Sequence, residues 1–270
     1  FFGPWICGSA IFVHHSPRFN PKQTLEFLEK YPITTFCGAP TNYRMLVQED
    51  LSPYSFKTLR HCVAAGEPLN PEVIEVWEKA TGLKIRDDYG QTESVCLLGN
   101  FPCNEVKEGS MGKPSPGFHI AVVDEDGNEL PPGKEGDIAV KVKPERPVGL
   151  FKEYWKDPEK TKEVFRGDWY YTGDRAIVDE DGYFWFVGRA DDVILSAGYR
   201  IGPFEVESAL LEHPAVTESA VVSSPDETRG EVVKAFIVLA KGYEPSDELV
   251  KEIQDFVKEN TAPYKYPRKV

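Results

Sequence analysis

The 270-residue sequence lacks several features that would place it in other protein classes. Its most apolar start, Phe1–Val13, is interrupted by glycine and proline, is too short to span a bilayer, and follows no basic segment. Basic residues are also in deficit, because 31 lysines and arginines stand against 44 acidic residues and the formal charge is −13. Such a chain repels nucleic acid and anionic membranes, so any phosphate site must be local.

Cysteine and histidine are scarce as well. The five cysteines are an odd number without a CxxC pair, which indicates neither a disulfide framework nor a zinc site. The five histidines are scattered without acid or nucleophile spacing, so we assign none to catalysis. A reducing, intracellular setting fits best: we expect a cytoplasmic protein, or one of the mitochondrial matrix if the source is eukaryotic.

Apolar runs alternate with capped helical patterns in the first hundred residues. Asn20-Pro21 opens a predicted helix, and Asn70-Pro71 opens another that ends near Gly82. Runs at 33–36, 59–65 and 83–86 are typical of buried strands. This alternation favours an α/β fold with a parallel sheet covered by helices, over residues 1–104.

The pattern changes near Glu105. Apolar segments at 118–123 and 136–142, and then at 176–178 and 183–187, flank turns centred on Asp-Gly pairs and predict antiparallel hairpins. We therefore expect a barrel-like β subdomain over 105–188. Residues 189–270 then show a polar crossover and a small α+β pattern, with helices predicted at 203–212 and 247–260 and strands near 216–222 and 232–239.

The stretch Asp88–Glu93 carries the first candidate chemistry. It follows a predicted strand, where open α/β sheets place their ligands. Tyr89 offers a flat face to a purine, Thr92 a hydroxyl to a phosphate oxygen, and Glu93 a hard carboxylate to Mg²⁺. Taken alone, a polar turn explains this stretch equally well.

Two further stretches contain charged groups that suit a nucleotide. In Tyr170-Tyr171-Thr172-Gly173-Asp174, the carboxylate of Asp174 can accept hydrogen bonds from both hydroxyls of a ribose. In Gly188–Ile201, Arg189 can clamp ribose or phosphate and Arg200 can meet a second anion. Thr-Gly-Asp alone is a common turn sequence, so only the combination of these stretches indicates a nucleotide site.

Five motifs in one order resemble a known family. They are Gly66-Glu67-Pro68, Tyr89-Gly90-Gln91-Thr92-Glu93, Gly109-Ser110-Met111-Gly112-Lys113-Pro114, Tyr171-Thr172-Gly173-Asp174 and Gly188-Arg189 to Ile201. The chain resembles the adenylate-forming superfamily of acyl-CoA synthetases, luciferases and peptide-synthetase adenylation domains. It is most similar to the medium-chain acyl-CoA synthetases.

The resemblance implies a set of functional residues and cofactors. ATP or AMP, Mg²⁺ and coenzyme A would be the cofactors and a small carboxylic acid the substrate, with no nucleic-acid partner and homo-oligomer formation left open. The implied cofactor-binding residues are Gly66, Glu67, Pro68, Asp87, Asp88, Tyr89, Gly90, Gln91, Thr92, Asp174, Arg189, Ala197, Gly198, Tyr199, Arg200 and Arg229. The implied catalytic residues are Thr92, Glu93 and Arg200, with Glu93 also the metal ligand and Asp191 the hinge of a rotating C-terminal domain.

Some of these implied roles have open alternatives. Ala197-Gly198-Tyr199 matches the segment that docks when the thioester forms, and the Tyr266-Pro267-Arg268 segment matches positions that meet coenzyme A or the adenylate. A plain surface arginine is an equal alternative for Arg229. By the resemblance, 1–104 and 105–188 belong to the large N-terminal domain, and 189–270 is the hinge with a truncated C-terminal domain.

The resemblance also predicts the branch of the family. Acetyl- and propionyl-CoA synthetases have tryptophan at the position of Gly90, so glycine there favours a longer, branched or aromatic acid. Luciferases and many adenylation domains have lysine at the position of Leu195, so leucine there favours the medium-chain acyl-CoA synthetases over those two branches. We expect an AMP-forming acid-thiol ligase. The alternatives are an aryl-CoA ligase, a peptide-synthetase-type adenylation domain, and, from another class, an inactive nucleotide-binding fragment.

Two motifs of the family are missing from the sequence. Neither the Ser/Thr/Gly-rich phosphate loop nor the closing lysine of the C-terminal domain is present. Losing one such electrostatic contact typically costs about 2.7–4 kcal/mol of transition-state stabilisation. We therefore expect an internal fragment that adenylates poorly by itself.

Overall fold

The structure is a computed structural model that describes residues 2–67 and 69–270. The chain divides into two compact units, Phe1–Asp88 and Tyr89–Val270. The finer division at residues 104 and 188 stays a prediction. Among the described residues, no helix combines the length and the apolar character needed to cross a membrane.

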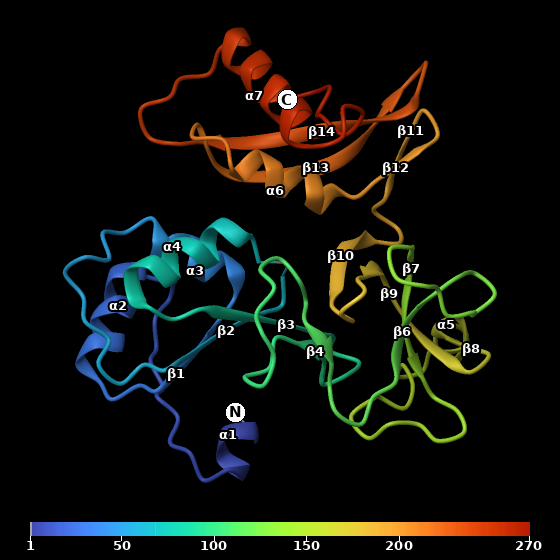
Figure 1. Ribbon diagram of the computed structural model, residues 1–270, viewed down its shortest axis with the longest axis horizontal. Helices are drawn as coiled ribbons and strands as arrows, with labels where there is room; N and C mark the ends of the chain where they lie inside the picture. Colours follow the sequence, from blue (N-terminus) through green and yellow to red (C-terminus); the bar gives the residue numbers. More distant parts are fainter. Residues whose placement is uncertain (1, 68) are drawn as a thin grey trace. The chain divides into compact units, whose positions relative to one another are not determined.

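The first unit is a parallel sheet with helices, as the sequence predicted (Figure 1). Strand β1 pairs in parallel with β2, and β2 pairs in parallel with β3. The helices are α1 (Phe2–Ile6), α2 (Pro21–Lys30), α3 (Pro40–Val47) and α4 (Pro71–Thr81). The strands are β1 (Thr35–Gly38), β2 (His61–Ala65) and β3 (Ile85–Gly90), whose last two residues belong to the second unit.

Local chemistry sets the helix ends of this unit. The Asn20 side chain accepts a hydrogen bond from the Gln23 N–H at 3.0 Å, and Pro21 follows at the first helical position of α2. Helix α4 ends at Gly82, which has the left-handed φ of 73° that suits a helix C-cap. Both predicted starts and the predicted stop are therefore confirmed.

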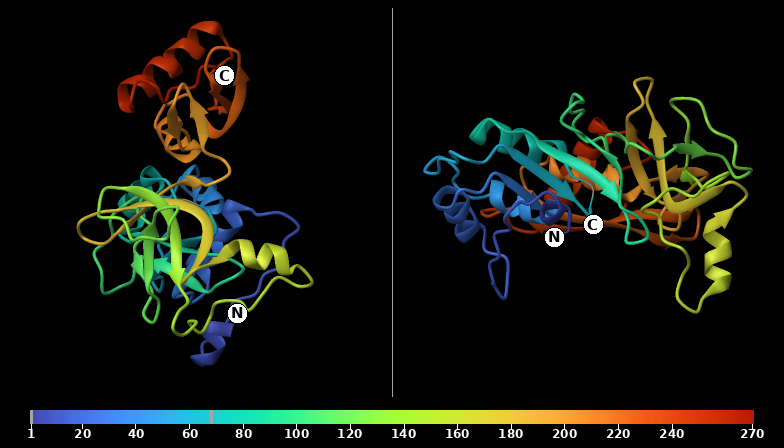
Figure 2. Two further views of the ribbon diagram at one scale, coloured as in Figure 1. Left: turned by 90° about the vertical axis from the view of Figure 1, so that its right-hand side faces the viewer. Right: turned by 90° about the horizontal axis from the view of Figure 1, so that it is seen from below.

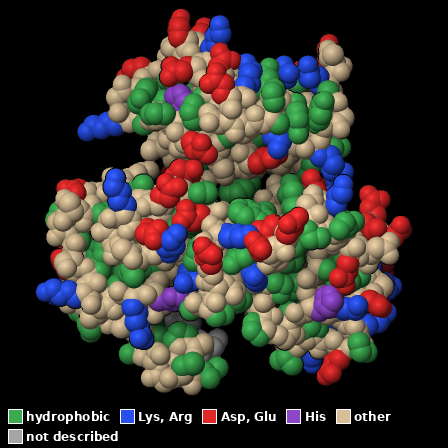
Figure 3. All heavy atoms as spheres, viewed as in Figure 1, with side chains coloured by type: hydrophobic (Ala, Val, Ile, Leu, Met, Phe, Trp, Pro, Cys, Tyr) green, Lys and Arg blue, Asp and Glu red, His purple; other side chains and the backbone are tan. Residues whose placement is uncertain are grey.

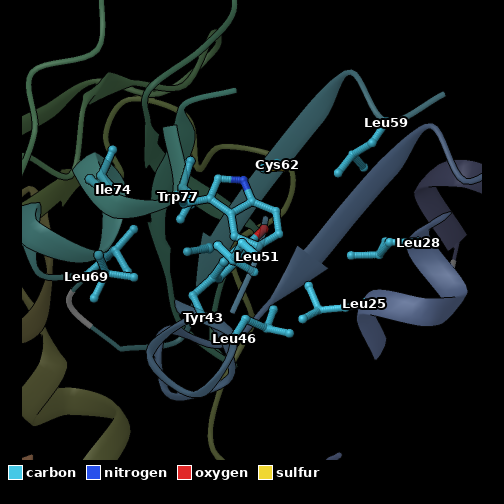
Figure 4. Packing of buried hydrophobic residues seen from close by; sticks show 13 residues of the cluster. Leu25, Leu28, Tyr43, Leu46, Leu51, Leu59, Cys62, Leu69, Ile74 and Trp77 are labelled. Atoms are coloured by element: carbon cyan, nitrogen blue, oxygen red, sulfur yellow. The ribbon is translucent and has the colours of Figure 1, made fainter. Parts of the chain in front are cut away.

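The core of the first unit lies between the helices and the sheet (Figure 4). Trp77 from α4 is fully buried, and its ring meets that of Tyr43 from α3 edge to face at 5.5 Å. Leu25 and Leu28 of α2 are buried in the same cluster. Burying side chains of this size typically contributes about 1.5–3 kcal/mol each.

The strand boundaries in this unit differ from the prediction in one important place. The strand predicted at 83–86 starts at Ile85 and continues to Gly90. Asp88, Tyr89 and Gly90 therefore lie within β3, and the turn begins only at Gln91. Strand pairing overrides the polar composition here, because Asp87 and Asp88 pair in register with Ala64 and Ala65 of β2.

The second unit begins with an antiparallel sheet, which confirms the predicted hairpins. Its main path runs β10-β9-β7-β6, and β8 pairs with β9. Strand β4 pairs antiparallel with β5, and both belong to the sheet order β1-β2-β3-β4-β5. The elements are β4 (Cys96–Gly99), β5 (Lys113–Pro114), β6 (Ile120–Val123), β7 (Glu135–Lys141), α5 (Pro158–Val164), β8 (Phe165–Arg166), β9 (Trp169–Val178) and β10 (Phe184–Arg189).

The remainder of the second unit is an α+β region in the sheet order β12-β11-β14-β13. Its elements are β11 (Ile194–Ser196), β12 (Tyr199–Ile201), α6 (Pro203–Leu211), β13 (Val216–Asp226), β14 (Gly230–Leu239) and α7 (Asp247–Asn260). Ile253 and Val257 of α7 pack into one core with residues of α6, β13 and β14, and Figure 2 shows α7 lying along this sheet. The helix predicted at 247–260 is confirmed.

The hairpin β11–β12 was not predicted, because we interpreted its sequence as a polar crossover. Its two-residue turn is Ala197-Gly198, with φ of 50° and 85°. Positive φ at both positions is the geometry that fits a tight hairpin, but Ala-Gly is a weaker sequence signal for it than Asn-Gly.

Acidic and basic side chains are interspersed over the face shown in Figure 3, and no single-sign patch dominates it.

Candidate functional site

Asp174 is the centre of the candidate site in the second unit. It lies on β9, paired in register with Arg189 on β10, and only 6% of the residue is exposed. Its Oδ2 accepts hydrogen bonds from the Tyr89 hydroxyl at 2.5 Å and from Gln91 Nε2 at 2.9 Å. Residues separated by more than eighty positions in the sequence thus meet at one carboxylate.

The side-chain amide of Gln91 is held on both ends by the protein. Its Nε2 also donates to the Thr172 carbonyl at 2.9 Å, and its Oε1 accepts from the Tyr170 hydroxyl at 2.9 Å. These partners fix which end of the amide faces Asp174. The arrangement gives Gln91 a role in orienting Asp174, in addition to the cofactor contact that the sequence suggested.

The second oxygen of Asp174 faces a cation. Arg189 Nη1 lies 4.0 Å from Oδ1, and the Arg189 side chain is 54% exposed. Within the part of the chain that the structure describes, no group donates a hydrogen bond to Oδ1. Burial raises the pKa of Asp174, while the Tyr89 hydrogen bond and the Arg189 charge oppose that shift.

Glu93 forms the other acidic part of this site. Its Oε1 accepts a hydrogen bond from the Tyr154 hydroxyl at 2.8 Å. Burial raises the pKa of Tyr170, and the charge of Glu93 raises it further together with that of Asp174. The carboxylates of Glu93 and Asp174 therefore both lie close enough to Tyr170 to affect its pKa.

The carboxylate of Glu93 suits a hard cation. Within residues 2–67 and 69–270, no group of three or more His, Cys, Asp and Glu side chains could hold a metal ion by itself. Mg²⁺ is commonly bound by one or two carboxylates together with waters and substrate phosphates. A single accessible carboxylate such as Glu93 fits that mode of binding.

Gly90 and Thr92 flank these residues. A Cβ atom added to Gly90 would lie 2.6 Å from the Val95 carbonyl oxygen, closer than real Cβ contacts occur. This close approach explains the glycine without any reference to an acyl group, so Gly90 alone does not support the predicted open pocket. Thr92 is exposed.

The predicted residues Gly66 and Glu67 lie in the first unit. Gly66 is exposed with φ of 99°, and the Glu67 carboxylate accepts from Thr41 Oγ1 and Arg44 Nη2, both at 2.8 Å. The Glu67 side chain is therefore engaged in an ion pair. Pro68, which the sequence also placed in the adenine pocket, lies outside the described residues.

Asp87 and Asp88 follow one another on β3. Asp87 is 5% exposed, and burial raises its pKa, with the charge of Asp88 adding to the shift. Asp88 is partly buried and contributes to raising the pKa of the Cys37 thiol, for which burial is the larger cause.

The structure brings the implied coenzyme A residues together at the β11–β12 turn. The Ala197 N–H donates to the Arg229 carbonyl at 3.1 Å, so Arg229 lies beside the turn although 32 positions separate the two residues. Tyr199 stacks on Tyr264 with ring centroids 4.1 Å apart. Arg200 is half exposed, and Asp191 is exposed in the turn before β11.

Sequence reasoning missed the roles of Tyr154 and Tyr170. Tyr154 reaches Glu93 across 61 positions and Tyr170 reaches Gln91 across 79. No local pattern encodes such contacts, and only the motif that includes Tyr170 drew attention to that part of the chain.

Comparison with known proteins identifies the family. Residues 1–155 match the family model for the AMP-binding enzyme, and residues 205–270 match the AMP-binding enzyme C-terminal domain. The chain is 63% identical to acyl-coenzyme A synthetase ACSM3, mitochondrial, of Pongo abelii, over 100% of this chain and 46% of the relative. It is 60% identical to the human acyl-coenzyme A synthetase ACSM4, mitochondrial, over 100% of this chain and 47% of the relative.

Solved structures agree with these relatives. The anthranilate CoA ligase AuaEII in complex with anthranoyl-AMP is 36% identical with a TM-score of 0.88, covering 98% of this chain and 50% of that protein. ATP-bound MatB from Rhodopseudomonas palustris is 33% identical with a TM-score of 0.84, covering 95% of this chain and 50% of that protein. These neighbours confirm the predicted α/β fold class.

The chain spans about half the length of the relatives that it matches. The predicted resemblance is confirmed, since the family model covers more than half of the chain. This chain belongs to the AMP-binding enzyme family.

Proposed function

We propose that the complete protein is an AMP-forming acyl-CoA synthetase. A carboxylate oxygen of the acid attacks the α-phosphorus of ATP and releases pyrophosphate, giving an acyl adenylate. The thiolate of coenzyme A then attacks the acyl carbon, and AMP leaves as the thioester forms. The acyl-coenzyme A synthetases named above, which match the whole chain at 60–63% identity, support this reaction.

The observation that carries the proposal is the geometry at Asp174. One carboxylate oxygen is fixed by Tyr89 and Gln91, and the other faces Arg189 without a donor of its own in the described structure. A preoriented, charged acceptor of this kind suits the hydroxyls of a ribose, and Arg189 can add a contact to ribose or phosphate. Each such charged hydrogen bond is typically worth about 1.5–3 kcal/mol.

The placement of Asp174 at the ribose suggests roles for the residues around it. Tyr89 would contribute its ring to the adenine, Thr92 its hydroxyl to a phosphate oxygen, and Glu93 would hold Mg²⁺. When bound, Mg²⁺ would neutralise negative charge on the phosphates. Residues of the first unit, Gly66 to Pro68 with Asp87 and Asp88, are proposed to surround the adenine on the basis of the family motifs.

The C-terminal hairpin is proposed to serve the second half-reaction. Ala197-Gly198 forms an exposed turn without a bulky side chain, with Tyr199, Arg200 and Arg229 beside it. An exposed turn of small residues can lie against the pantetheine arm, and the arginines can meet the phosphates of coenzyme A. Asp191, between β10 and β11, is the proposed hinge.

We propose a medium-chain, branched or aromatic acid as the substrate. The similarity to the acyl-coenzyme A synthetases favours an aliphatic acid. Structural likeness to an anthranilate CoA ligase and to a benzoate CoA ligase, the latter 34% identical with a TM-score of 0.80, favours an aryl-CoA ligase as the second candidate. The relatives are named as mitochondrial proteins, which supports the matrix over the cytoplasm as the site of action.

The experiment uses the complete protein with ATP, Mg²⁺, coenzyme A and a panel of butyrate, octanoate, isobutyrate, benzoate and anthranilate. We expect pyrophosphate release and a matching amount of acyl-CoA, with octanoate among the best substrates. A preference for benzoate or anthranilate would select the aryl-CoA ligase. Nucleotide binding without pyrophosphate release from any acid would overturn the proposal and favour an inactive binding protein.

The chain itself, without the rest of the protein, is a useful second sample. Because it contains neither the phosphate loop nor the closing lysine, we expect it to release little pyrophosphate under the same conditions. Turnover comparable to that of the complete protein would contradict the assignment of the missing motifs.

A further inference from the structure

The segment that precedes α5 runs beside Glu93. The Val95 N–H donates to the Gly149 carbonyl at 3.0 Å, and Ser94 and Leu150 form an antiparallel bridge. The Phe151 N–H then donates to the Glu93 carbonyl at 2.7 Å. The backbone of Glu93 is therefore fixed by a segment nearly sixty residues further along the chain.

Tyr154, three residues after Phe151, engages the side chain of the same glutamate. Its hydroxyl donates to Glu93 Oε1 at 2.8 Å. Backbone and side chain of Glu93 are thus held from one segment, which leaves the carboxylate little freedom to rotate.

The position of Tyr154 is itself determined from several sides. Its backbone N–H donates to Thr161 Oγ1 at 3.0 Å, its ring lies 4.8 Å from that of Phe151, and Lys160 Nζ lies 4.6 Å from its ring centroid. Arg146 Nη1 holds the segment by donating to the carbonyls of Phe151 and Lys152. A hydroxyl anchored in this way can orient a carboxylate.

From these contacts we infer that Tyr154 is a positioning residue for the metal-binding carboxylate: it holds Oε1 of Glu93 and directs Oε2 toward Mg²⁺. The inference rests on the proposed role of Glu93 as the metal ligand. Residues that orient a ligating carboxylate typically change metal affinity by about 10-fold to 100-fold when they are replaced.

The test measures metal binding directly. The complete protein is saturated with a non-hydrolysable ATP analogue, and Mn²⁺ is titrated while the electron paramagnetic resonance signal of the free ion is recorded. We expect Tyr154→Phe to raise the Kd for Mn²⁺ by about 10-fold and to leave the metal-free affinity for the analogue unchanged.

Two variants make the result specific. Tyr183→Phe is the matched control, because the Tyr183 hydroxyl also donates a hydrogen bond, at 2.8 Å to the Glu105 carbonyl, whereas the side-chain donor to Glu93 in the described structure is Tyr154. Thr161→Val removes the anchor of Tyr154 and should weaken Mn²⁺ binding in the same direction by a smaller factor. It also replaces Tyr154→Phe as the test if that variant does not fold.

The outcomes separate the two proposals. If Glu93→Gln leaves Mn²⁺ binding unchanged, the metal role of Glu93 is wrong. If Glu93→Gln weakens binding but Tyr154→Phe and Thr161→Val do not, or if Tyr183→Phe weakens it equally, the positioning role of Tyr154 is wrong.

Discussion

At the scale of single residues, the candidate site depends on how a few side chains are held. Asp174 and Glu93 each have one oxygen engaged by a tyrosine hydroxyl, at 2.5 and 2.8 Å, from Tyr89 and Tyr154 respectively. This arrangement fixes the side chains and leaves the second oxygen of each carboxylate for another partner. Preorganisation of this kind lowers the cost of binding, because little ordering remains to be done when the ligand arrives.

The first prediction concerns nucleotide binding by Asp174. In the complete protein, Asp174→Ala should raise KM for ATP by about 10-fold to 100-fold, since each charged hydrogen bond is worth about 1.5–3 kcal/mol. Steady-state kinetics with varied ATP provide the measurement. The control is Asp168→Ala, which removes an exposed carboxylate paired with Lys143 on the surface. Unchanged ATP kinetics in Asp174→Ala would refute the ribose assignment.

The second prediction concerns pH. Burial raises the pKa of Asp174 above its unfolded value, so between these two pKa values the folded state binds more protons than the unfolded state. The free energy of unfolding therefore decreases as pH rises through that window, and ionised Asp174 costs stability above it.

Asp174→Asn removes this cost. We expect the variant to gain stability relative to the wild type as pH rises through that window, while its ATP affinity falls. Urea denaturation at several pH values measures the difference. A difference that is independent of pH would contradict the assignment of the shift to Asp174.

At the scale of elements, the β11–β12 hairpin is the least predictable part of the fold and carries a proposed function. Its turn needs positive φ at two consecutive positions, and one of them is occupied by Ala197 with φ of 50°. Such a conformation is uncommon for a residue with a Cβ atom, and observed strain of this kind is often found at functional positions.

The third prediction uses Gly198, whose φ is 85° and around which a Cβ atom would meet nothing within 4 Å. Gly198→Val should destabilise the protein by about 1–2 kcal/mol through backbone strain. It should also slow thioester formation while leaving pyrophosphate release in the first half-reaction intact. Urea denaturation and the two half-reactions measured separately test both parts.

Gly242 offers a matched control on the same α+β region. Its φ is 99°, and a Cβ atom there would also meet nothing within 4 Å. Gly242→Val should therefore cost similar stability and leave thioester formation unchanged. Equal effects of the two variants on thioester formation would show that the turn at Gly198 has no special role.

At the scale of the whole molecule, several separate cores stabilise the chain. One core lies in the first unit, and others lie in the antiparallel sheet and in the α+β region of the second unit. A substitution in one core acts first on the region that the core stabilises, and chains of this kind need not unfold in a single step.

The last prediction follows from these separate cores. Leu25→Ala in α2 removes a fully buried side chain and should destabilise the first unit by about 2–5 kcal/mol. Hydrogen exchange measured by mass spectrometry should show faster exchange in peptides of α2, β1 and β2, with little change in α7. Equal acceleration throughout the chain would contradict the assignment of Leu25 to a local core.

The amino-acid sequence by itself determined the features that depend on local chemistry. Asn20, Pro71 and Gly82 specify helix ends, and alternating apolar residues with Asp-Gly turns specify the hairpins. Motif order alone identified the family, because several short patterns in one order rarely coincide by chance. These signals span few residues, so they can be recognised without coordinates.

The tertiary structure decided what depends on residues far apart in the chain. It showed that β3 continues to Gly90, that Gln91 orients Asp174, and that Arg229 lies beside the Ala197 turn. It also showed that Tyr154 holds Glu93 across 61 positions. The sequence contains all of these side chains, but only the folded backbone brings them within hydrogen-bond distance of one another. Their proximity depends on strand register and packing rather than on residues that are neighbours in the sequence.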